Sequence, residues 1–358
     1  LFSFFYLLMV ISESVQTVIA KYSSSEDSSS KLKNLLFKTE KKALLASLIT
    51  IMVYLLLSVW LSSLLKIEYT LLALNSFIII SVFFLPITRG ILQGRKRFTA
   101  MGLNVIIEAS IKLIFSVLFV WIGWRVYGAL TGIIIAIIIS FLLSLLMLKD
   151  ILRAKEEDIN TPNIYSYAPQ VLVANLVILA FYSLDILIAR AIFSPEISGQ
   201  YAIASTIGKI IFLLTQPISK AMFPLSAEKS VGNSSRKIFY SALFILTLLL
   251  LTAIVFIYLF PDFLISIFSG KTLPYAASVL FYISLAMCIL SITNLVLIYK
   301  ISKSEIKGSY LLLGFILLES VLLIIYSSDL VQFSKALVVS SILLLGGSIF
   351  LCRRKNSQ

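Results

Sequence analysis

The chain is a succession of apolar blocks of about twenty residues, each bounded by charged or turn-forming residues. A helix rises about 1.5 Å per residue, so each block is long enough to cross a hydrocarbon core about 30 Å thick. Barrel strands would be about half as long and would alternate apolar with polar residues. The pattern therefore predicts an all-α polytopic membrane protein with eleven spans, at residues 1 to 20, 43 to 65, 70 to 88, 100 to 122, 127 to 148, 165 to 189, 200 to 224, 238 to 260, 276 to 299, 308 to 326 and 334 to 351.

Composition supports this prediction and limits the chemistry. The chain is 59% apolar and 13% charged, with a mean hydropathy of +1.03, which leaves too little polar surface for a water-soluble protein. There is no histidine, and the cysteines are Cys288 and Cys352. We therefore expect no metal site, no cofactor and no redox chemistry.

The distribution of the 30 lysines and arginines predicts an orientation. Alternate loops hold 23 of them on one side of the membrane and five on the other, while Lys112 and Lys209 fall inside spans. By the positive-inside rule the first side is cytoplasmic, and so is the C-terminus. The net charge of +13 is explained by topology, so we expect no nucleic-acid partner. We expect a multi-pass protein of the plasma, or inner, membrane.

Eleven crossings would put residue 1 outside, within an apolar run that starts at Leu1. We therefore expect a preceding span, for twelve in the intact protein. A cleaved signal peptide is the alternative.

The spacing of the spans repeats along the chain. Spans that start at 43, 70, 100 and 127 are followed by spans that start 195, 206, 208 and 207 residues later. This predicts two six-helix lobes around a central cavity: residues 1–148, from which the first helix is missing, and residues 168–358, joined by a cytoplasmic linker at 149–167. Such repeats are typical of alternating-access transporters. A channel, a membrane-bound synthase and a chance spacing are the alternatives. Residues 31–42 form either a short interfacial helix with a leucine face or a solvated basic loop.

Charged groups at membrane depth are candidate functional residues, because burying them in hydrocarbon is costly. Lys112, Lys209 and Glu319 fall near mid-depth, with Glu13 and Glu108 closer to span ends. Glu108 and Lys112 are four residues apart, so they can pair on one helix face. Lys209 has no acid nearby on its own helix. It is therefore predicted to be an unpaired cation facing a cavity, with an interhelical salt bridge to Glu13, Glu108 or Glu319 as the alternative.

Two further charged positions lie near span ends. Arg89 follows Pro86 and either lines a cytoplasmic vestibule or reaches lipid phosphates. Asp185 and Arg190 lie near the outer end of the sixth span, where a local structural interaction is expected.

Four short stretches resemble one family of membrane proteins. They are Leu85 to Phe98 (LPITRGILQGRKRF), Trp124 to Ala129 (WRVYGA), Asp185 to Ala202 with its SPE and GQYA elements, and Phe223 to Ser226 (FPLS). In this order and spacing they resemble the polysaccharide and O-antigen flippases of the multidrug/oligosaccharidyl-lipid/polysaccharide exporter superfamily. We expect structural roles for Asp185, Arg190, Gly199, Tyr201 and Pro224, and the resemblance implies twelve or more helices.

The resemblance also implies a substrate: a polyprenyl-diphosphate-linked oligosaccharide, moved from the cytoplasmic to the outer leaflet. Lys209, Arg89 and Lys112 would then contact the diphosphate, while Glu13, Glu108 and Glu319 would act as coupling or pairing acids. Expected partners are membrane lipid, the lipid-linked glycan, and glycan polymerases or glycosyltransferases.

Three alternatives stand beside this function. A cation-coupled drug antiporter of the same superfamily would hold unpaired acids in its cavity. A membrane glycosyltransferase or polymerase would be an enzyme, but the sequence has no acidic motif or large outer loop for sugar chemistry. An inactive fragment is the third alternative.

Overall fold

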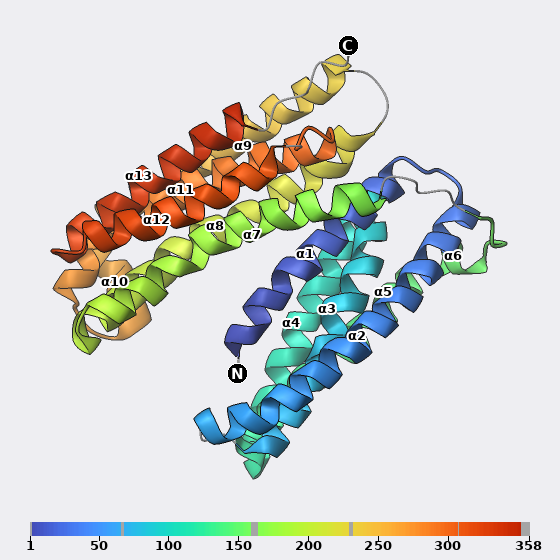
Figure 1. The fold of residues 1–358 in the computed structure, drawn as a ribbon, viewed down its shortest axis with the longest axis horizontal. Coiled ribbons are helices and arrows are strands. Elements are labelled where there is room, and N and C mark those ends of the chain that lie inside the picture. The colour runs from blue at the N-terminus through green and yellow to red at the C-terminus, as the bar shows by residue number, and fades with distance from the viewer. Residues whose placement is uncertain (1, 66–67, 159–163, 229–231, 307, 352–358) are drawn as a thin grey trace. The chain divides into compact units, whose positions relative to one another are not determined.

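The computed structural model describes residues 2–65, 68–158, 164–228, 232–306 and 308–351, and all regular structure in these ranges is helical (Figure 1). The prediction of an all-α polytopic membrane protein is confirmed. The chain divides into two compact units, Leu1–Ala168 and Pro169–Gln358, here called the N-terminal and C-terminal units.

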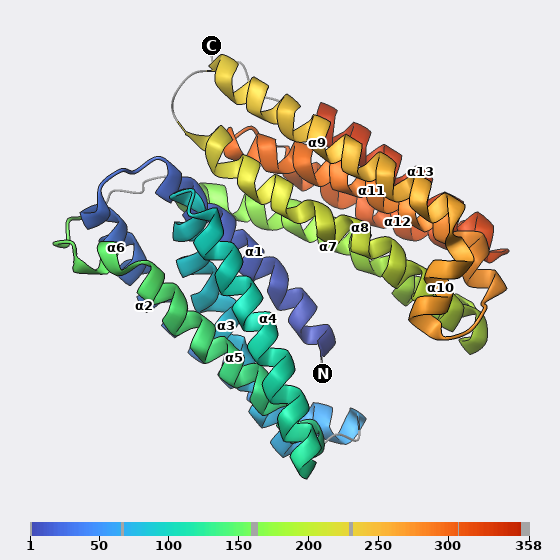
Figure 2. The same ribbon diagram turned by 180° about the vertical axis from the view of Figure 1, so that it is seen from behind.

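The N-terminal unit is organised around one helix. Its elements are α1 (Phe2–Ser24), α2 (Ser29–Leu65), α3 (Tyr69–Gly94), α4 (Phe98–Phe119), the π-helical turn η1 (Val120–Trp124), α5 (Arg125–Met147) and α6 (Lys149–Arg153). Helix α3 contacts α1, α2, α4 and α5, and most of its length is buried. It therefore forms the core of this unit, visible from both sides in Figures 1 and 2.

The C-terminal unit has a similar central helix. Its elements are α7 (Ile164–Ile192), which starts just before the boundary, α8 (Pro195–Ala227), α9 (Gly232–Leu259), α10 (Pro261–Ser269), α11 (Pro274–Ser302), the 3-10 turn η2 (Ser309–Leu312), α12 (Leu313–Ile325) and α13 (Leu330–Phe350). Helix α11 contacts α8, α9, α10 and α13. In sequence, α3 and α11 start 205 residues apart, as do α5 and α13.

A helix occupies each of the eleven ranges where the sequence predicts a span. Within the described residues, eight helical segments are long and apolar enough to cross a membrane. One of them, Phe98–Met147, contains both α4 and α5, because η1 joins them across a kink at Gly123 (φ 102°). Helix α12 is shorter than a full span, and α1 is not among the eight.

The start of α2 corrects one expectation. Residues 31–42 are neither a separate interfacial helix nor a loop, because α2 runs without a break from Ser29 to Leu65. The leucine face, Leu32, Leu35 and Leu36, is buried in a cluster with Leu148 and Ile151. The apolar face that the sequence suggested for a lipid surface therefore packs on protein, at the end of α5 and in α6.

The expected linker, 149–167, is structured at its beginning. After α6, the Ala154 carbonyl accepts a hydrogen bond from Lys33 Nζ (2.9 Å), and Glu156 Oε1 accepts one from Asn34 (2.8 Å). Lys38 and Asp158 form an ion pair. Residues 154–158 are thus attached to α2. Residues 159–163, including Pro162, lie outside the described residues.

Close packing of α1 on α3 depends on two glycines of the stretch Leu85 to Phe98. A Cβ on Gly90 would lie 2.8 Å from the Gln16 carbonyl oxygen, and one on Gly94 would lie 2.6 Å from that of Ala20. Gln93, between them, accepts a hydrogen bond from Gln16 (2.9 Å). These residues therefore hold α1 against α3. Arg89, which directly precedes Gly90, belongs to a polar cluster described below.

Candidate functional site

A cluster of charged and polar groups is buried in the C-terminal unit, between α7 and α8. Asp185 of α7 is fully buried, and its Oδ1 lies 2.8 Å from Lys209 Nζ of α8, whose side chain is 7% exposed. The other carboxylate oxygen accepts hydrogen bonds from the Tyr201 hydroxyl (3.0 Å) and the Ser205 hydroxyl (2.8 Å). The Lys209 ammonium also lies over the Tyr182 ring, 5.2 Å from its centroid. Asp185 is thus an acceptor of three bonds from one face of α8.

A second acid belongs to this cluster. Glu319 of α12 is fully buried, and neither of its carboxylate oxygens has a hydrogen-bond partner among the described residues. Its carboxyl group interacts electrostatically with Asp185 and Lys209, and with Tyr201. The cluster therefore contains two acids and one base, and only one of the acids is hydrogen-bonded.

These contacts correct two expectations. Lys209 is not an unpaired cation, and its hydrogen-bonded partner is Asp185 rather than Glu13, Glu108 or Glu319. Asp185 does not make the expected local interaction with Arg190, which is exposed. The prediction failed because it considered acids on the same helix and at Glu13, Glu108 and Glu319, whereas the neighbouring helix α7 supplies the partner, Asp185.

A different cluster lies in the N-terminal unit, near the turn between α3 and α4. The guanidinium of Arg89 forms an ion pair with Glu108, and its Nε donates to Asn104 Oδ1 (2.8 Å). It also donates to the Ser140 hydroxyl of α5 (3.1 Å), and Asn104 donates to the Ser140 carbonyl (2.7 Å). Asn104 and Ser140 are buried, whereas the side chains of Arg89 and Glu108 are each 16% exposed. This network joins three helices.

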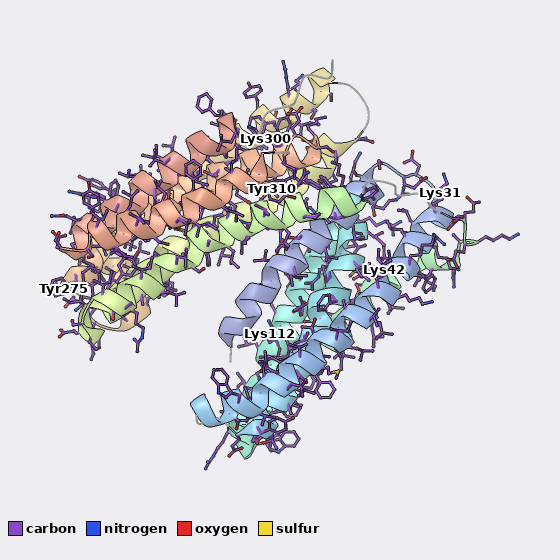
Figure 3. All side chains as sticks on the ribbon, in the orientation of Figure 1. Lys31, Lys42, Lys112, Tyr275, Lys300 and Tyr310 are labelled. Atoms are coloured by element: carbon purple, nitrogen blue, oxygen red, sulfur yellow. The ribbon has the colours of Figure 1, made fainter. Side chains whose placement is uncertain are left out.

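The expected pair of Glu108 with Lys112 is therefore wrong, because Glu108 binds Arg89. Lys112 is exposed on α4, and Figure 3 shows its position on that helix. Glu13 lies half-buried on α1. The structure thus separates the three predicted cations into two that are paired and one that is exposed.

The other stretches of the resemblance have local structural explanations. Ser194 is the N-cap of α8 and accepts a hydrogen bond from the Ile197 amide (3.5 Å), and Pro195 follows at the first position of the helix. Tyr201 is fully buried and binds Asp185, whereas Gly199 has open space around it. Pro224 is buried near the end of α8. Ser194 and Pro195 thus lie at the start of α8, Tyr201 connects α8 to Asp185 of α7, and Pro224 lies near the end of α8.

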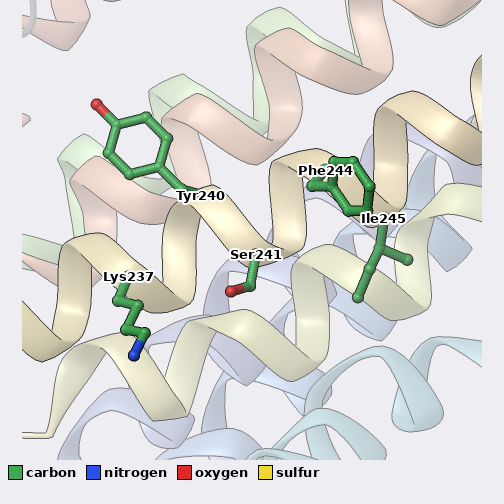
Figure 4. Close-up of a pocket in the computed structure, with 5 residues that line it drawn as sticks. All are labelled: Lys237, Tyr240, Ser241, Phe244 and Ile245. Carbon is green, nitrogen blue, oxygen red and sulfur yellow. The ribbon is translucent and has the colours of Figure 1, made fainter.

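Two surface depressions lie in the C-terminal unit. One, of about 640 Å³, is lined by five residues of α9, and Figure 4 shows Lys237 and Tyr240 extending from that helix in different directions. The other, of about 670 Å³, is lined by residues from the α7–α8 turn and the beginnings of α11 and α13. Tyr275, labelled in Figure 3, is one of the residues that line this second depression. Neither depression is lined by a residue of the two charged clusters. Within the described residues, no group of three or more His, Cys, Asp or Glu side chains is placed to hold a metal ion.

Sequence comparison assigns the family. Residues 2–230, more than half of the chain, match the family described as polysaccharide biosynthesis protein. The chain belongs to this family. No curated protein matches the sequence.

Comparison with solved structures shows what the fold resembles. A MATE in complex with MaL6 has a TM-score of 0.81 and 12% identity, covering 98% of this chain and 86% of that chain. An outward-facing multidrug resistance MATE family transporter of the MOP superfamily has a TM-score of 0.74 and 13% identity, covering 98% and 85%. This polysaccharide biosynthesis protein thus has a fold similar to that of these MATE structures.

Proposed function

We propose that the protein moves a polyprenyl-diphosphate-linked oligosaccharide from the cytoplasmic to the outer leaflet by alternating access, for cell-surface glycan synthesis. The family match over residues 2–230 carries this proposal. It is supported by the transporter fold along 98% of the chain. The membrane would be the plasma membrane, with eleven crossings in this chain, two lobes around a central cavity, and a cytoplasmic C-terminus.

The physical task explains why a transporter is needed. A sugar-diphosphate headgroup must pass through hydrocarbon, where unpaired charge is costly, while the polyprenyl tail remains in lipid. An inside-negative potential assists outward movement of an anion by about 2.3 kcal/mol per charge per 100 mV, or roughly 4.6 kcal/mol for two charges. The protein has to supply a polar path and a cation that offsets desolvation of the diphosphate.

We assign this role first to Lys112. Its ammonium is exposed on α4, within the helical segment that spans Phe98–Met147. Arg89 is a second contact, because its guanidinium is partly exposed although it is paired with Glu108. Lys209 is enclosed between Asp185 and Tyr182, so we do not assign it a direct contact with the diphosphate.

The test is flipping of a fluorescent polyprenyl-diphosphate oligosaccharide by the full chain in proteoliposomes, followed by quenching from outside. The wild type should exceed protein-free vesicles. Lys112→Ala should lower the rate about ten-fold, the loss of a charge-assisted contact worth about 1.4 kcal/mol, and Lys112→Arg should retain part of it. The matched control is Lys237→Ala, an exposed lysine on α9.

Flipping no faster than in protein-free vesicles would overturn the substrate. Normal flipping by a well-inserted Lys112→Ala variant would overturn the role of Lys112 alone.

Drug/cation antiport is the second candidate, favoured by the multidrug resistance transporter among the similar folds. The test is efflux of a cationic dye driven by a sodium or proton gradient. Such efflux in vesicles that do not flip the lipid-linked glycan would favour drug/cation antiport over glycan flipping.

A further inference from the structure

The depression of about 670 Å³ at the beginnings of α11 and α13 has a mixed lining. Tyr275 belongs to it and is 49% exposed, and Phe193 is one of its apolar residues. Ser278, Ser328 and Asp329 add two hydroxyls and a carboxylate. Small-molecule sites have volumes of about 300 to 1,000 Å³ and combine a largely apolar lining with a few polar groups. The depression therefore has the size and the composition of a ligand site.

Its polar groups have hydrogen-bonding capacity to spare. Asp329 Oδ1 accepts a bond from the Gln332 amide (2.7 Å), but no described residue donates to Oδ2. The Tyr275 hydroxyl likewise has no hydrogen-bond partner within the described part of the chain. Ser278 donates its hydroxyl to the Tyr275 carbonyl (2.9 Å), which leaves the oxygen of Ser278 able to accept. The depression thus offers acceptors at Asp329 and Ser278, and a hydroxyl at Tyr275.

Contacts beneath the depression hold its lining in place. The Phe193 ring packs edge-on against the Phe333 ring, with 5.5 Å between their centroids. At the start of α11, the Tyr275 amide donates to the Gln200 side chain of α8 (3.2 Å). The lining is therefore ordered before a ligand arrives, which lowers the entropic cost of binding.

The charge of the depression disfavours an anion. Of the described residues that line it, Asp329 is the charged one, and its carboxylate repels phosphates and other carboxylates. The amide groups at helix starts attract anions, but Ser194 already caps α8 and Asp329 already caps α13. An uncharged polar molecule therefore fits this depression better than a lipid phosphate or a diphosphate does.

We propose that this depression binds an uncharged pyranose sugar of the transported glycan. A pyranose has C–H groups on its two faces and hydroxyl groups around its edge. One face packs on the Tyr275 ring, and edge hydroxyls donate to Asp329 Oδ2 and to Ser278. The proposal rests on the proposed function and names where the glycan, rather than its diphosphate, is bound. In the predicted orientation, α11 and α13 begin on the outer side, to which the glycan is delivered.

The test is saturation-transfer NMR of the full chain in nanodiscs with methyl glycosides of a neutral hexose, an N-acetylhexosamine and a hexuronic acid. At least one uncharged glycoside should bind, and more tightly than the hexuronic acid. Tyr275→Ala should raise its Kd about ten-fold, whereas Tyr275→Phe, which keeps the ring, should retain most of the binding. The matched control is Tyr310→Ala, because Tyr310 is 50% exposed in the same unit but lies outside the depression (Figure 3).

A second variant tests the carboxylate. Asp329→Asn keeps an N-cap for α13, so the helix should remain intact. The Kd of the uncharged glycoside should rise about five-fold, because a carboxylate is a stronger acceptor than an amide. Discrimination against the hexuronic acid should fall in the same variant. Absence of binding by both uncharged glycosides, or equal binding by Tyr275→Ala and the wild type, would overturn the proposal.

The binding assay needs no translocation, so it is independent of the flipping assay. Sugar binding without flipping would support the site and overturn the proposed function. Flipping without sugar binding would overturn the site alone. Tyr275→Ala should also slow flipping in proteoliposomes, and an unchanged rate in a variant that has lost sugar binding would overturn the assignment of the site to the transported glycan.

Discussion

The N-terminal unit pairs a partly exposed acid, Glu108, with an arginine, whereas the C-terminal unit buries two acids and pairs one of them with a lysine. In the first cluster, Arg89 has a fork of donors that reaches Glu108, Asn104 and Ser140 together, and every partner accepts or donates a bond. In the second, Lys209 binds Asp185, and Glu319 is left without a donor. The first cluster is partly exposed, whereas the second is almost completely closed.

This difference separates a cluster in which every group is bound from one that contains an acid without a hydrogen-bond donor. A planar guanidinium that is bound on three sides has no reason to move, because each alternative position loses a bond. The lysine of the second cluster hydrogen-bonds one acid, Asp185, and leaves the other, Glu319, without a donor. The buried Glu319 lies on α12, and the exposed Lys112 lies on α4.

The largest effect is expected from Lys209→Ala. The change leaves Asp185 buried without its cation, and breaking a buried pair by removing one partner costs about 3 to 5 kcal/mol. The free energy of unfolding in mixed detergent measures this loss. Asp185→Asn in the same chain should restore part of it, since the stranded charge is then removed. Lys112→Ala, an exposed lysine, is the control and should change little. A Lys209→Ala protein as stable as the wild type would show that the two clusters do not differ in this way.

A smaller effect is expected from Arg89→Ala. The variant deprives Glu108 and Asn104 of a donor, but Glu108 is partly exposed and water can replace the lost bond. We expect a loss of about 2 kcal/mol, the scale of a charge-assisted hydrogen bond. The same unfolding titration measures it, and Arg89→Lys should recover less than half, because an ammonium cannot reach all three partners. A loss larger than that of Lys209→Ala would reverse the comparison.

The helices could be predicted from the sequence because a span must be apolar over its whole length. The start of α2 could not be predicted, because lysines interrupt its leucine face. Only the fold shows that Leu148 and Ile151 cover that face. The sequence identified the stretch containing Gly90 and Gly94 as a motif. It gave no sign that both glycines are needed for contact with α1.

The members of the clusters were predictable, but their partners were not. Arg89, Glu108, Lys209 and Glu319 stand out because charge is rare in apolar segments. Their pairing depends on the rotation and register of helices that lie far apart in sequence, and on the reach of long side chains. Local spacing suggested Glu108 with Lys112 and Asp185 with Arg190, and in both cases a different helix supplies the partner.

The smallest effect is expected from an ion pair outside the apolar segments. This pair shows how much an ion pair contributes to stability when it is exposed to water. Arg97 donates to Asp150 of α6 (2.8 Å), and both side chains are partly exposed (31% and 48%). The hydrogen bond from Arg97 lowers the pKa of the Asp150 carboxyl below its ordinary value. The stability from this pair is therefore present above the unfolded-state pKa, about 3.9 for an aspartate, and is lost as the pH falls through the lower, folded-state pKa.

Because solvent screens the pair, we expect Asp150→Asn to cost at most about 0.5 kcal/mol of unfolding free energy at neutral pH. In strong acid we expect no cost, because the Asp150 carboxyl of the wild type is then also neutral. Unfolding titrations of both proteins at the two pH values measure the difference. A cost at neutral pH as large as that of Arg89→Ala would mean that burial does not set the strength of these pairs, and the contrast between the two clusters would lose its physical basis.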